Sequence, residues 1–429
     1  MADIKLAGGD ALVTPKSDHH DGSDFGDFLT SEIDLVEMEH YWDSWRGYDP
    51  KETIYPSYPV SVGEIIGERY RVEHSVGKKG PSSIWMAHDM QDKKDVALKI
   101  ICDGPRANME IEKQDMIRGL FPDSPEFVTY LRIFQVSTGG RQYQVLVLPL
   151  KGPHVDFFTL EQMPLASRMA AANDLLVALE KLHNAGIVHY NLHAHNCMWG
   201  MKDTHNLPRT EKYSKLGRPQ KIRLPLDKGI PKAGDMVQPM EIPEALRTED
   251  FFLTDFAYAT KVGDPSSEPS EPGVRYLPLH HYCSPERLHG QVPSFACDMW
   301  SYMVLFATLY CGHEFWDPIN HGSVLSKHVW FFGPLPEEWK GLYRQNDALD
   351  EWYIPDTSHL LGKPLEPRKS MMKRLEWYHR DHPEEDPKAL ELVRTIMMKV
   401  FRYNPEERLT ATQLLNDKDF QALMERYGC

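Results

Sequence analysis

At 429 residues the chain is longer than one ordinary domain and suits two lobes around a cleft. Hydrophobic residues make up 41% and charged residues 26%, an ordinary globular balance that supports a sizeable core. The formal net charge of −15 argues against direct nucleic-acid binding, which needs basic surface. It is compatible with basic peptide partners, although an acidic protein without such partners would have the same composition.

The six cysteines are scattered without a CxxC pair, which predicts reduced thiols in an intracellular protein, cytoplasmic or nuclear. The N-terminus lacks the basic-then-apolar run of a secretory signal. No apolar stretch approaches the roughly 20 residues that span a bilayer. We therefore expect a soluble protein without membrane association.

The chain begins with a tail, residues 1–58. Residues 1–30 are rich in Asp, Gly, Ser and His, which predicts disorder. Residues 31–45 have the spacing of a short amphipathic helix, and a Pro- and Tyr-rich extended lead-in follows. Then the pattern becomes β, with one helix over 107–120 and strands expected at 69–74, 83–87, 95–101, 127–136 and 142–148.

After Lys151-Gly152-Pro153 the chain becomes mainly helical. Helices are expected at 167–185, 298–310, 390–400 and 410–423. The polar piece between 196 and 255 lacks periodicity and predicts a surface insertion over about 201–250. The fold class expected is bilobal α+β, with a β-rich N-lobe at 59–150 and a helical C-lobe at 151–425.

A candidate phosphate-binding lysine ends the strand Val96-Ala97-Leu98-Lys99. Alone the pattern is weak, because a strand often ends in a lysine at a solvated face. Such a lysine needs a carboxylate to hold it, and Glu112 lies thirteen residues later in the next helix. Glu110 is the alternative if the helix is rotated or starts elsewhere.

Further motifs follow in a fixed order. His189-Tyr190-Asn191-Leu192-His193-Ala194-His195-Asn196 comes after the long helix, and Asp255-Phe256-Ala257 offers a metal-binding carboxylate. Ser284-Pro285-Glu286 and Asp298 follow, and Arg408 is well placed to pair with Glu286. Each piece alone suits an ordinary loop, but six in order are very unlikely by chance.

Residues 56 to about 424 resemble the protein-kinase family, and within it the SR-protein-kinase-like branch of fungi. The lead-in from Tyr58-Pro59-Val60 to Arg69-Tyr70, the strand Ser83 to Asp89, and the insertion before Asp255 carry the branch resemblance. It implies an ATP/Mg²⁺ cleft, Ser/Thr phosphotransfer and Arg/Ser-rich basic segments as partners.

The same resemblance exposes departures in the catalytic loop. Asn191 stands where the family has its base aspartate, and an amide cannot take up a proton at neutral pH. General base catalysis contributes roughly 10²- to 10⁴-fold, so the expected loss is large. His193 replaces the catalytic-loop lysine, and Leu279 replaces the threonine that braces both. Rescue by His193 or His195 as a substitute base is an open alternative.

The glycine loop and the activation segment, residues 255–286, depart from the family pattern as well. Gly77 and Gly80 are retained, but Lys79 stands where the second glycine should be, and Pro81 stiffens the tip. Tyr190 replaces the arginine that would read a phosphate on the activation segment, so phosphorylation control there is not expected.

The nucleotide side is better preserved. By resemblance, Leu148 is the gatekeeper and Leu150 offers backbone groups to adenine, while Pro149 removes one donor. The expected nucleotide-binding residues are Gly77, Gly80, Ala97, Lys99, Glu112, Leu148 and Leu150, with Asn196 and Asp255 as magnesium ligands. The expected structural residues, which hold the fold with or without catalysis, are His189, Phe256, Glu286, Asp298 and Arg408.

Three functions remain open. The first is a pseudokinase that binds ATP and Mg²⁺ but works through partners, as the losses at Asn191, His193 and Leu279 indicate. The second is a weakly active, atypical Ser/Thr kinase. The third is a scaffold that no longer binds ATP, motivated by Lys79 and Pro149.

Overall fold

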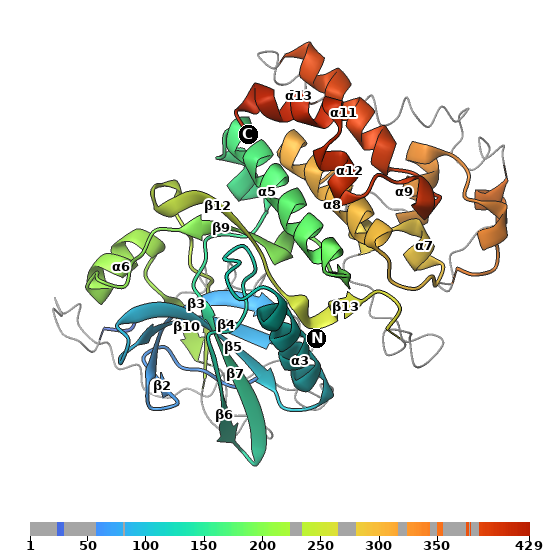
Figure 1. Ribbon diagram of the computed structural model, residues 1–429. Helices are drawn as coiled ribbons and strands as arrows, with labels where there is room; N and C mark the ends of the chain where they lie inside the picture. The colour runs from blue at the N-terminus through green and yellow to red at the C-terminus, as the bar shows by residue number, and fades with distance from the viewer. Residues whose placement is uncertain are drawn as a thin grey trace, which may run out of the picture.

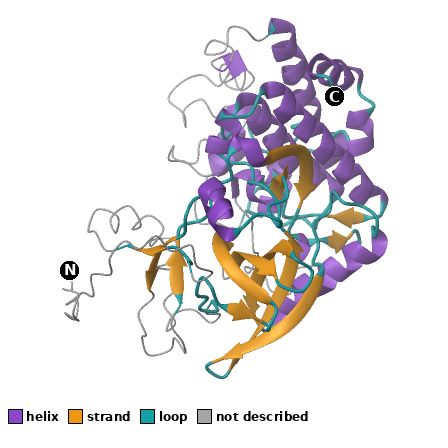
Figure 2. Cartoon of the chain, turned by 90° about the vertical axis from the view of Figure 1, so that its left-hand side faces the viewer, coloured by secondary structure: helices purple, strands orange, loops and turns teal. Residues whose placement is uncertain are grey.

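The computed structural model describes residues 24–29, 57–79, 82–223, 234–264, 280–315, 324–343, 350–354, 375–376, 378 and 386–429. Strands gather in one half of the molecule and helices in the other (Figure 2), which confirms the predicted two-lobed α+β architecture. Within these residues, no helix combines the length and the apolar character that a membrane crossing requires.

A six-stranded antiparallel sheet forms the N-lobe, in the order β2-β3-β4-β5-β7-β6. Aromatic and β-branched residues suit its pleated strands and bury one face, where Trp85, Val96 and Val145 belong to one cluster. The opposite face packs Ile101 and Leu146 against Ala107 of the neighbouring helix. The strands are β2 (Ile65–Ile66), β3 (Tyr70–Lys79), β4 (Ser82–Asp89), β5 (Lys94–Cys102), β6 (Arg132–Thr138) and β7 (Arg141–Pro149).

Helix α3 (Pro105–Leu120) lies beside this sheet (Figure 1). Proline at the start is compatible with the helix because the first N–H groups have no helical partner. Ile117 is buried in the main core, as expected of an inward anchor. Leu120, the last residue of the helix, is 43% exposed at the surface.

The C-lobe is built around two apolar helices, α5 (Leu165–Asn184) and α8 (Phe295–Cys311). Both belong to one large core with the C-terminal helices. The helix predicted over 410–423 is two helices, because Asp417 caps a new N-terminus by accepting from the backbone N–H of Asp419 and Phe420. The other elements are α4 (Phe157–Glu161), β8 (Ile187–Val188), β9 (Cys197–Met201), β12 (Arg247–Leu253), β13 (Thr260–Lys261), α7 (Pro285–Leu288), α9 (Val324–Phe332), α11 (Pro387–Val400), α12 (Ala411–Leu415) and α13 (Lys418–Tyr427).

The insertion expected over about 201–250 contains secondary structure of its own, a point that the sequence left open. It forms α6 (Arg209–Leu216), β10 (Gln220–Arg223) and β11 (Asp235–Val237), and Tyr213 is buried. Val237 belongs to the same apolar cluster as the N-lobe strands. Periodicity missed these elements because a few apolar side chains suffice when they bury against an existing lobe.

Part of the N-terminal tail is ordered too. Strand β1 (Asp27–Phe28) pairs in parallel with β10, contrary to the disorder predicted for residues 1–30. The helix expected at 31–45 lies outside the described residues.

Buried charges fasten the insertion to the N-lobe. Lys212 Nζ lies 3.1 Å from Glu73 Oε2 and 2.5 Å from Asp95 Oδ1, and all three side chains are nearly inaccessible. The backbone N–H of Met240 donates to Ser75 O at 2.8 Å. Ser75 directly precedes Val76 and Gly77 on strand β3, and these two residues line a cleft between the lobes. The insertion therefore supports a strand that lines this cleft.

Candidate functional site

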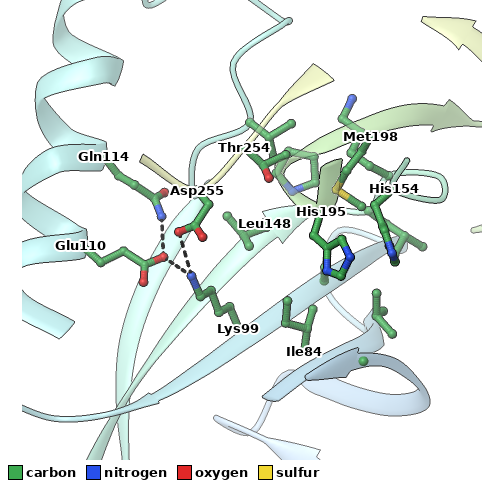
Figure 3. A pocket seen from close by; sticks show the side chains of 17 residues that line it. Ile84, Lys99, Glu110, Gln114, Leu148, His154, His195, Met198, Thr254 and Asp255 are labelled. Atoms are coloured by element: carbon green, nitrogen blue, oxygen red, sulfur yellow. Dashed lines mark hydrogen bonds and ion pairs between the residues drawn. The ribbon is translucent and has the colours of Figure 1, made fainter. Parts of the chain in front are cut away.

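A cleft between the two lobes is lined by six of the expected site residues, whereas Asn191, His193 and Asn196 are not part of its described lining. The space within it, open solvent at its mouth included, is about 960 Å³. Figure 3 shows charged groups gathered at one side and two histidines at the other. Its lining is Val76, Gly77, Ile84, Ala97, Lys99, Glu110, Gln114, Val128, Leu148, Pro149, Leu150, Lys151, His154, His195, Met198, Thr254 and Asp255.

Lys99 is held between two carboxylates. Its Nζ lies 2.6 Å from Glu110 Oε1 and 3.5 Å from Asp255 Oδ1. Burial alone would lower the pKa of the Lys99 ammonium, but Asp255 and Glu110 outweigh burial and raise it. The cleft therefore contains a fixed positive charge, positioned from strand β5 and oriented by helix α3.

Glu110, and not Glu112, is the partner of Lys99, so the preferred prediction was wrong and its alternative was right. The Glu112 side chain is 75% exposed, and its Oε1 lies 3.5 Å from Nζ of the neighbouring Lys113. Two residues along a helix turn about 200°, so when Glu110 faces the cleft Glu112 must face away. The sequence left the helix phase open, and packing on the sheet sets it.

Asp255 has a backbone conformation that non-glycine residues seldom adopt, with φ 65° and ψ 68°. The following Phe256 is buried. Its ring centroid lies 5.8 Å from that of Phe127, in an edge-on contact, and 5.3 Å from that of His189. His189 Nε2 lies 3.1 Å from Thr254 O. These contacts fix the turn that directs the Asp255 carboxylate toward Lys99.

The loop that carries Asn191 is tied to the same turn. Asn196 Nδ2 donates to Asn191 O at 2.7 Å, and the Thr254 N–H donates to Asn196 O at 2.9 Å. Asp298 accepts the backbone N–H groups of His189 at 2.7 Å and Tyr190 at 2.9 Å. The loop is thus ordered by the predicted structural residues His189 and Asp298 and by the side chain of Asn196.

Two further loop residues face the activation segment. His193 is buried, with its ring centroid 6.1 Å from that of Tyr282 and 5.9 Å from that of His195. The Arg287 guanidinium lies 3.5 Å from the Tyr190 ring centroid, and its Nη1 donates to Tyr190 O at 2.6 Å. The Tyr190 ring therefore binds the Arg287 guanidinium through a cation–π contact.

The ion pair expected between Glu286 and Arg408 is present. Both guanidinium nitrogens lie 2.6 Å from the carboxylate oxygens, and the Arg408 side chain is fully buried. This bidentate pair joins the end of the activation segment to the C-terminal helices.

The apolar end of the cleft contains Ala97 and Leu148, which face each other across strands β5 and β7, and Leu150. Gly77 has φ 146° beside an irregularity in the pairing of β3 with β4, a conformation that favours glycine. Gly80, Pro81 and Leu279 lie outside the described residues, so the predictions about them are not addressed.

Sequence reasoning missed several lining residues, among them Gln114, His154 and Met198. Gln114 lies four residues after Glu110 on the same helix face, so the correct helix phase would have revealed it. His154 and Met198 lie on a loop and a short strand, and an isolated bridge pairs them. Neither carries a sequence signal of its own.

The donor set fits magnesium only together with phosphate. Among the described residues, no group of three or more His, Cys, Asp or Glu side chains could hold a metal ion. Mg²⁺ is commonly bound by one or two carboxylates plus substrate phosphates, which matches Asp255 with the neighbouring amide of Asn196.

Comparison with known proteins identifies the architecture. A family model described as "Protein kinase domain" matches residues 245–420. A solved kinase domain aligns with a TM-score of 0.56 at 15% identity, covering 85% of this chain and 98% of that one. The chain therefore has the protein-kinase fold, which generally uses ATP and Mg²⁺.

Two curated relatives are similar at low identity. A serine/threonine protein kinase of Aspergillus fumigatus is 22% identical over 374 residues, 84% of this chain and 86% of the relative. Human SRSF protein kinase 3 is 24% identical over 170 residues, 37% of this chain and 30% of that protein.

Proposed function

We propose that this chain, which has the protein-kinase fold, binds ATP with Mg²⁺ but transfers phosphate poorly, and acts chiefly by binding partners. The observation that carries the proposal is the contrast between the cleft and the loop bonded to its edge through Asn196 and Thr254. Lys99 is ion-paired with Glu110 and close to Asp255, whereas Asn191 stands at the position of the base.

Each group of the cleft has a definite role in this proposal. The Lys99 ammonium binds phosphate oxygens, and Asp255 with Asn196 supplies oxygen ligands to magnesium. Bound Mg²⁺ neutralises phosphate charge. The Asn191 amide orients a hydroxyl group but cannot accept its proton, so the chemical step lacks its general base.

A weakly active Ser/Thr kinase is the second candidate function. It is supported by the Lys99–Glu110 pair, because an active kinase needs this pair and the metal-binding aspartate in place together. Under this alternative, Asn191→Asp should raise phosphotransfer by roughly 10²-fold or more.

Phosphotransfer to peptide libraries, measured on wild type, Asn191→Asp and Lys99→Met, tests both candidates. We expect no robust turnover from wild type and a gain in Asn191→Asp that disappears when Lys99→Met is added. Efficient wild-type turnover that depends on Lys99 and Asp255 would refute impaired catalysis.

A thermal-shift measurement separates the proposal from a scaffold that no longer binds ATP. A ligand that binds only the native state stabilises it, by about 2.7 kcal/mol when the ligand concentration is 100 times Kd. This stabilisation raises the melting temperature. ATP with Mg²⁺ should stabilise wild type but not Lys99→Met. Equal melting temperatures with and without nucleotide would favour the scaffold.

Arg/Ser-rich basic segments are the proposed partners, in the cytoplasm or nucleus. The net charge of −15 and the similarity to a protein named SRSF protein kinase 3 support this class. An Arg/Ser-repeat peptide should bind more tightly than a Lys/Ala peptide of equal charge. Equal affinities would leave charge alone as the cause and contradict this partner class.

A further inference from the structure

Gln114 is a buried polar side chain in the cleft that the proposed chemistry does not use. It is 2% exposed, and its Nε2 donates to Glu110 Oε1 at 3.1 Å. Its Oε1 accepts the backbone N–H of Tyr130 at 2.8 Å. Because a backbone N–H can only donate, the amide oxygen must face Tyr130 and the amide nitrogen must face Glu110.

The segment that Gln114 contacts is anchored to both lobes. The Val128 N–H donates to Leu253 O at 2.9 Å, and Leu253 lies two residues before Asp255. The Leu131 N–H donates to Val147 O at 2.7 Å, and Val147 pairs with Leu98, next to Lys99. Gln114 thus ties helix α3 to a segment that is bonded to β12, two residues before Asp255, and to β7, the strand that pairs with the Lys99 strand β5.

Tyr130 receives two more contacts from the same helix. Its hydroxyl donates to Asp115, and the Arg118 guanidinium lies 4.4 Å from its ring centroid. Three side chains within five residues of α3 therefore hold the helix on one residue. A helix fastened in this way does not depend on nucleotide to bring Glu110 inward.

We propose that Gln114 is a positioning residue that holds Glu110 against Lys99 in the nucleotide-free protein. The consequence is regulatory: the charged groups are assembled before nucleotide arrives, and no partner is needed to move α3. The effect on nucleotide affinity rests on the proposed function, whereas the effect on the nucleotide-free protein does not.

Two variants separate the two hydrogen bonds. Gln114→Met keeps a side chain of similar length but removes both, leaving the buried Tyr130 N–H without its acceptor. Gln114→Glu keeps an acceptor for Tyr130 but places a second carboxylate beside Glu110. Gln135→Met, at an exposed position on β6, is the matched control.

Three measurements give the expected pattern. In nucleotide-free Gln114→Met, the Tyr130 amide should exchange about tenfold faster or more, and Lys99 should react faster with an amine reagent. Gln114→Glu should keep the Tyr130 protection but still increase Lys99 labelling. Both variants should weaken binding of ATP with Mg²⁺ about tenfold, and Gln135→Met should change none of the three.

Unchanged Tyr130 exchange or unchanged Lys99 labelling in Gln114→Met would overturn the positioning role. Faster exchange with undiminished nucleotide affinity would also overturn it. If wild type binds no nucleotide, the proposed function fails, and the labelling of nucleotide-free Lys99 still decides whether Gln114 positions Glu110.

Discussion

Replacement of Lys212 by methionine tests whether the insertion is an integral part of the N-lobe. Lys212 lies between Glu73 and Asp95, and its side chain is 3% exposed. Methionine keeps most of the aliphatic length but leaves two buried carboxylates without their shared cation. Removing one partner of a buried ion pair typically costs about 3–5 kcal/mol.

The remaining contacts place the expected loss at the lower end of that range. Glu73 retains Arg71 at 2.7 Å, and Asp95 retains His88 at 2.8 Å and Thr204 at 2.7 Å. We therefore expect Lys212→Met to lower the free energy of unfolding by about 3 kcal/mol. Adding Glu73→Gln should recover part of this loss, because it removes one buried charge.

Urea unfolding at pH 7, combined with exchange of the Met240 amide, measures the effect. The amide reports release of the insertion from β3 even if the lobes unfold later. Lys215→Met is the control, because Lys215 is on the same helix but 41% exposed and meets only Glu211 at 3.8 Å. A Lys212→Met protein within about 0.5 kcal/mol of wild type, with Met240 still protected, would refute the reasoning.

Acid unfolding provides a related check on the same cluster. Burial alone would raise the pKa of Asp95, but hydrogen bonds from Lys212 and His88 outweigh it and lower the pKa. A lowered folded pKa stabilises the protein above the unfolded value, near 4, and this contribution is lost as pH falls through the folded pKa. Lys212→Met should therefore unfold at higher pH than wild type.

Three further substitutions test other parts of the account. Glu286→Gln should destabilise by about 3 kcal/mol or more in urea unfolding, because Arg408 is fully buried, whereas exposed Glu407→Gln should have little effect. Tyr190→Arg should cost about 1–2 kcal/mol, because it replaces a ring that binds Arg287 with a second cation, and Tyr190→Phe, which keeps the ring, should cost less. Burial lowers the pKa of His328 to about 3, so this residue should cost the fold about 2 kcal/mol between pH 7 and pH 5, where only the unfolded state takes up the proton. His328→Phe, which keeps the ring beside Trp300, should flatten that pH dependence, and an unchanged slope would contradict it.

Much of the architecture was predictable because it depends on local patterns. Apolar spacing predicted α5 and α8 to within a few residues, and short β-rich runs predicted the N-lobe strands. The Glu286–Arg408 pair was predictable from the order of the motifs alone. The helices and strands are encoded in the residues that form them, whereas the Glu286–Arg408 pair joins positions 122 residues apart.

The missed features depend on contacts between distant segments. The phase of α3 is set by packing on the sheet, so Glu110 and Glu112 could not be separated from sequence with certainty. Lys212 contacts residues 139 and 117 positions away, and no periodicity reports such pairs. Tyr190 and Arg287 are 97 residues apart and meet only in the folded chain.

Calorimetric titration of ATP, with and without Mg²⁺, tests the central claim most directly. We predict one binding site that tightens when Mg²⁺ is present and disappears in Lys99→Met. Asp255→Asn should keep weak nucleotide binding but lose its dependence on magnesium, because a carboxylate ligand is replaced by an amide. The absence of binding by wild type, or binding that neither Mg²⁺ nor Lys99→Met alters, would contradict the account.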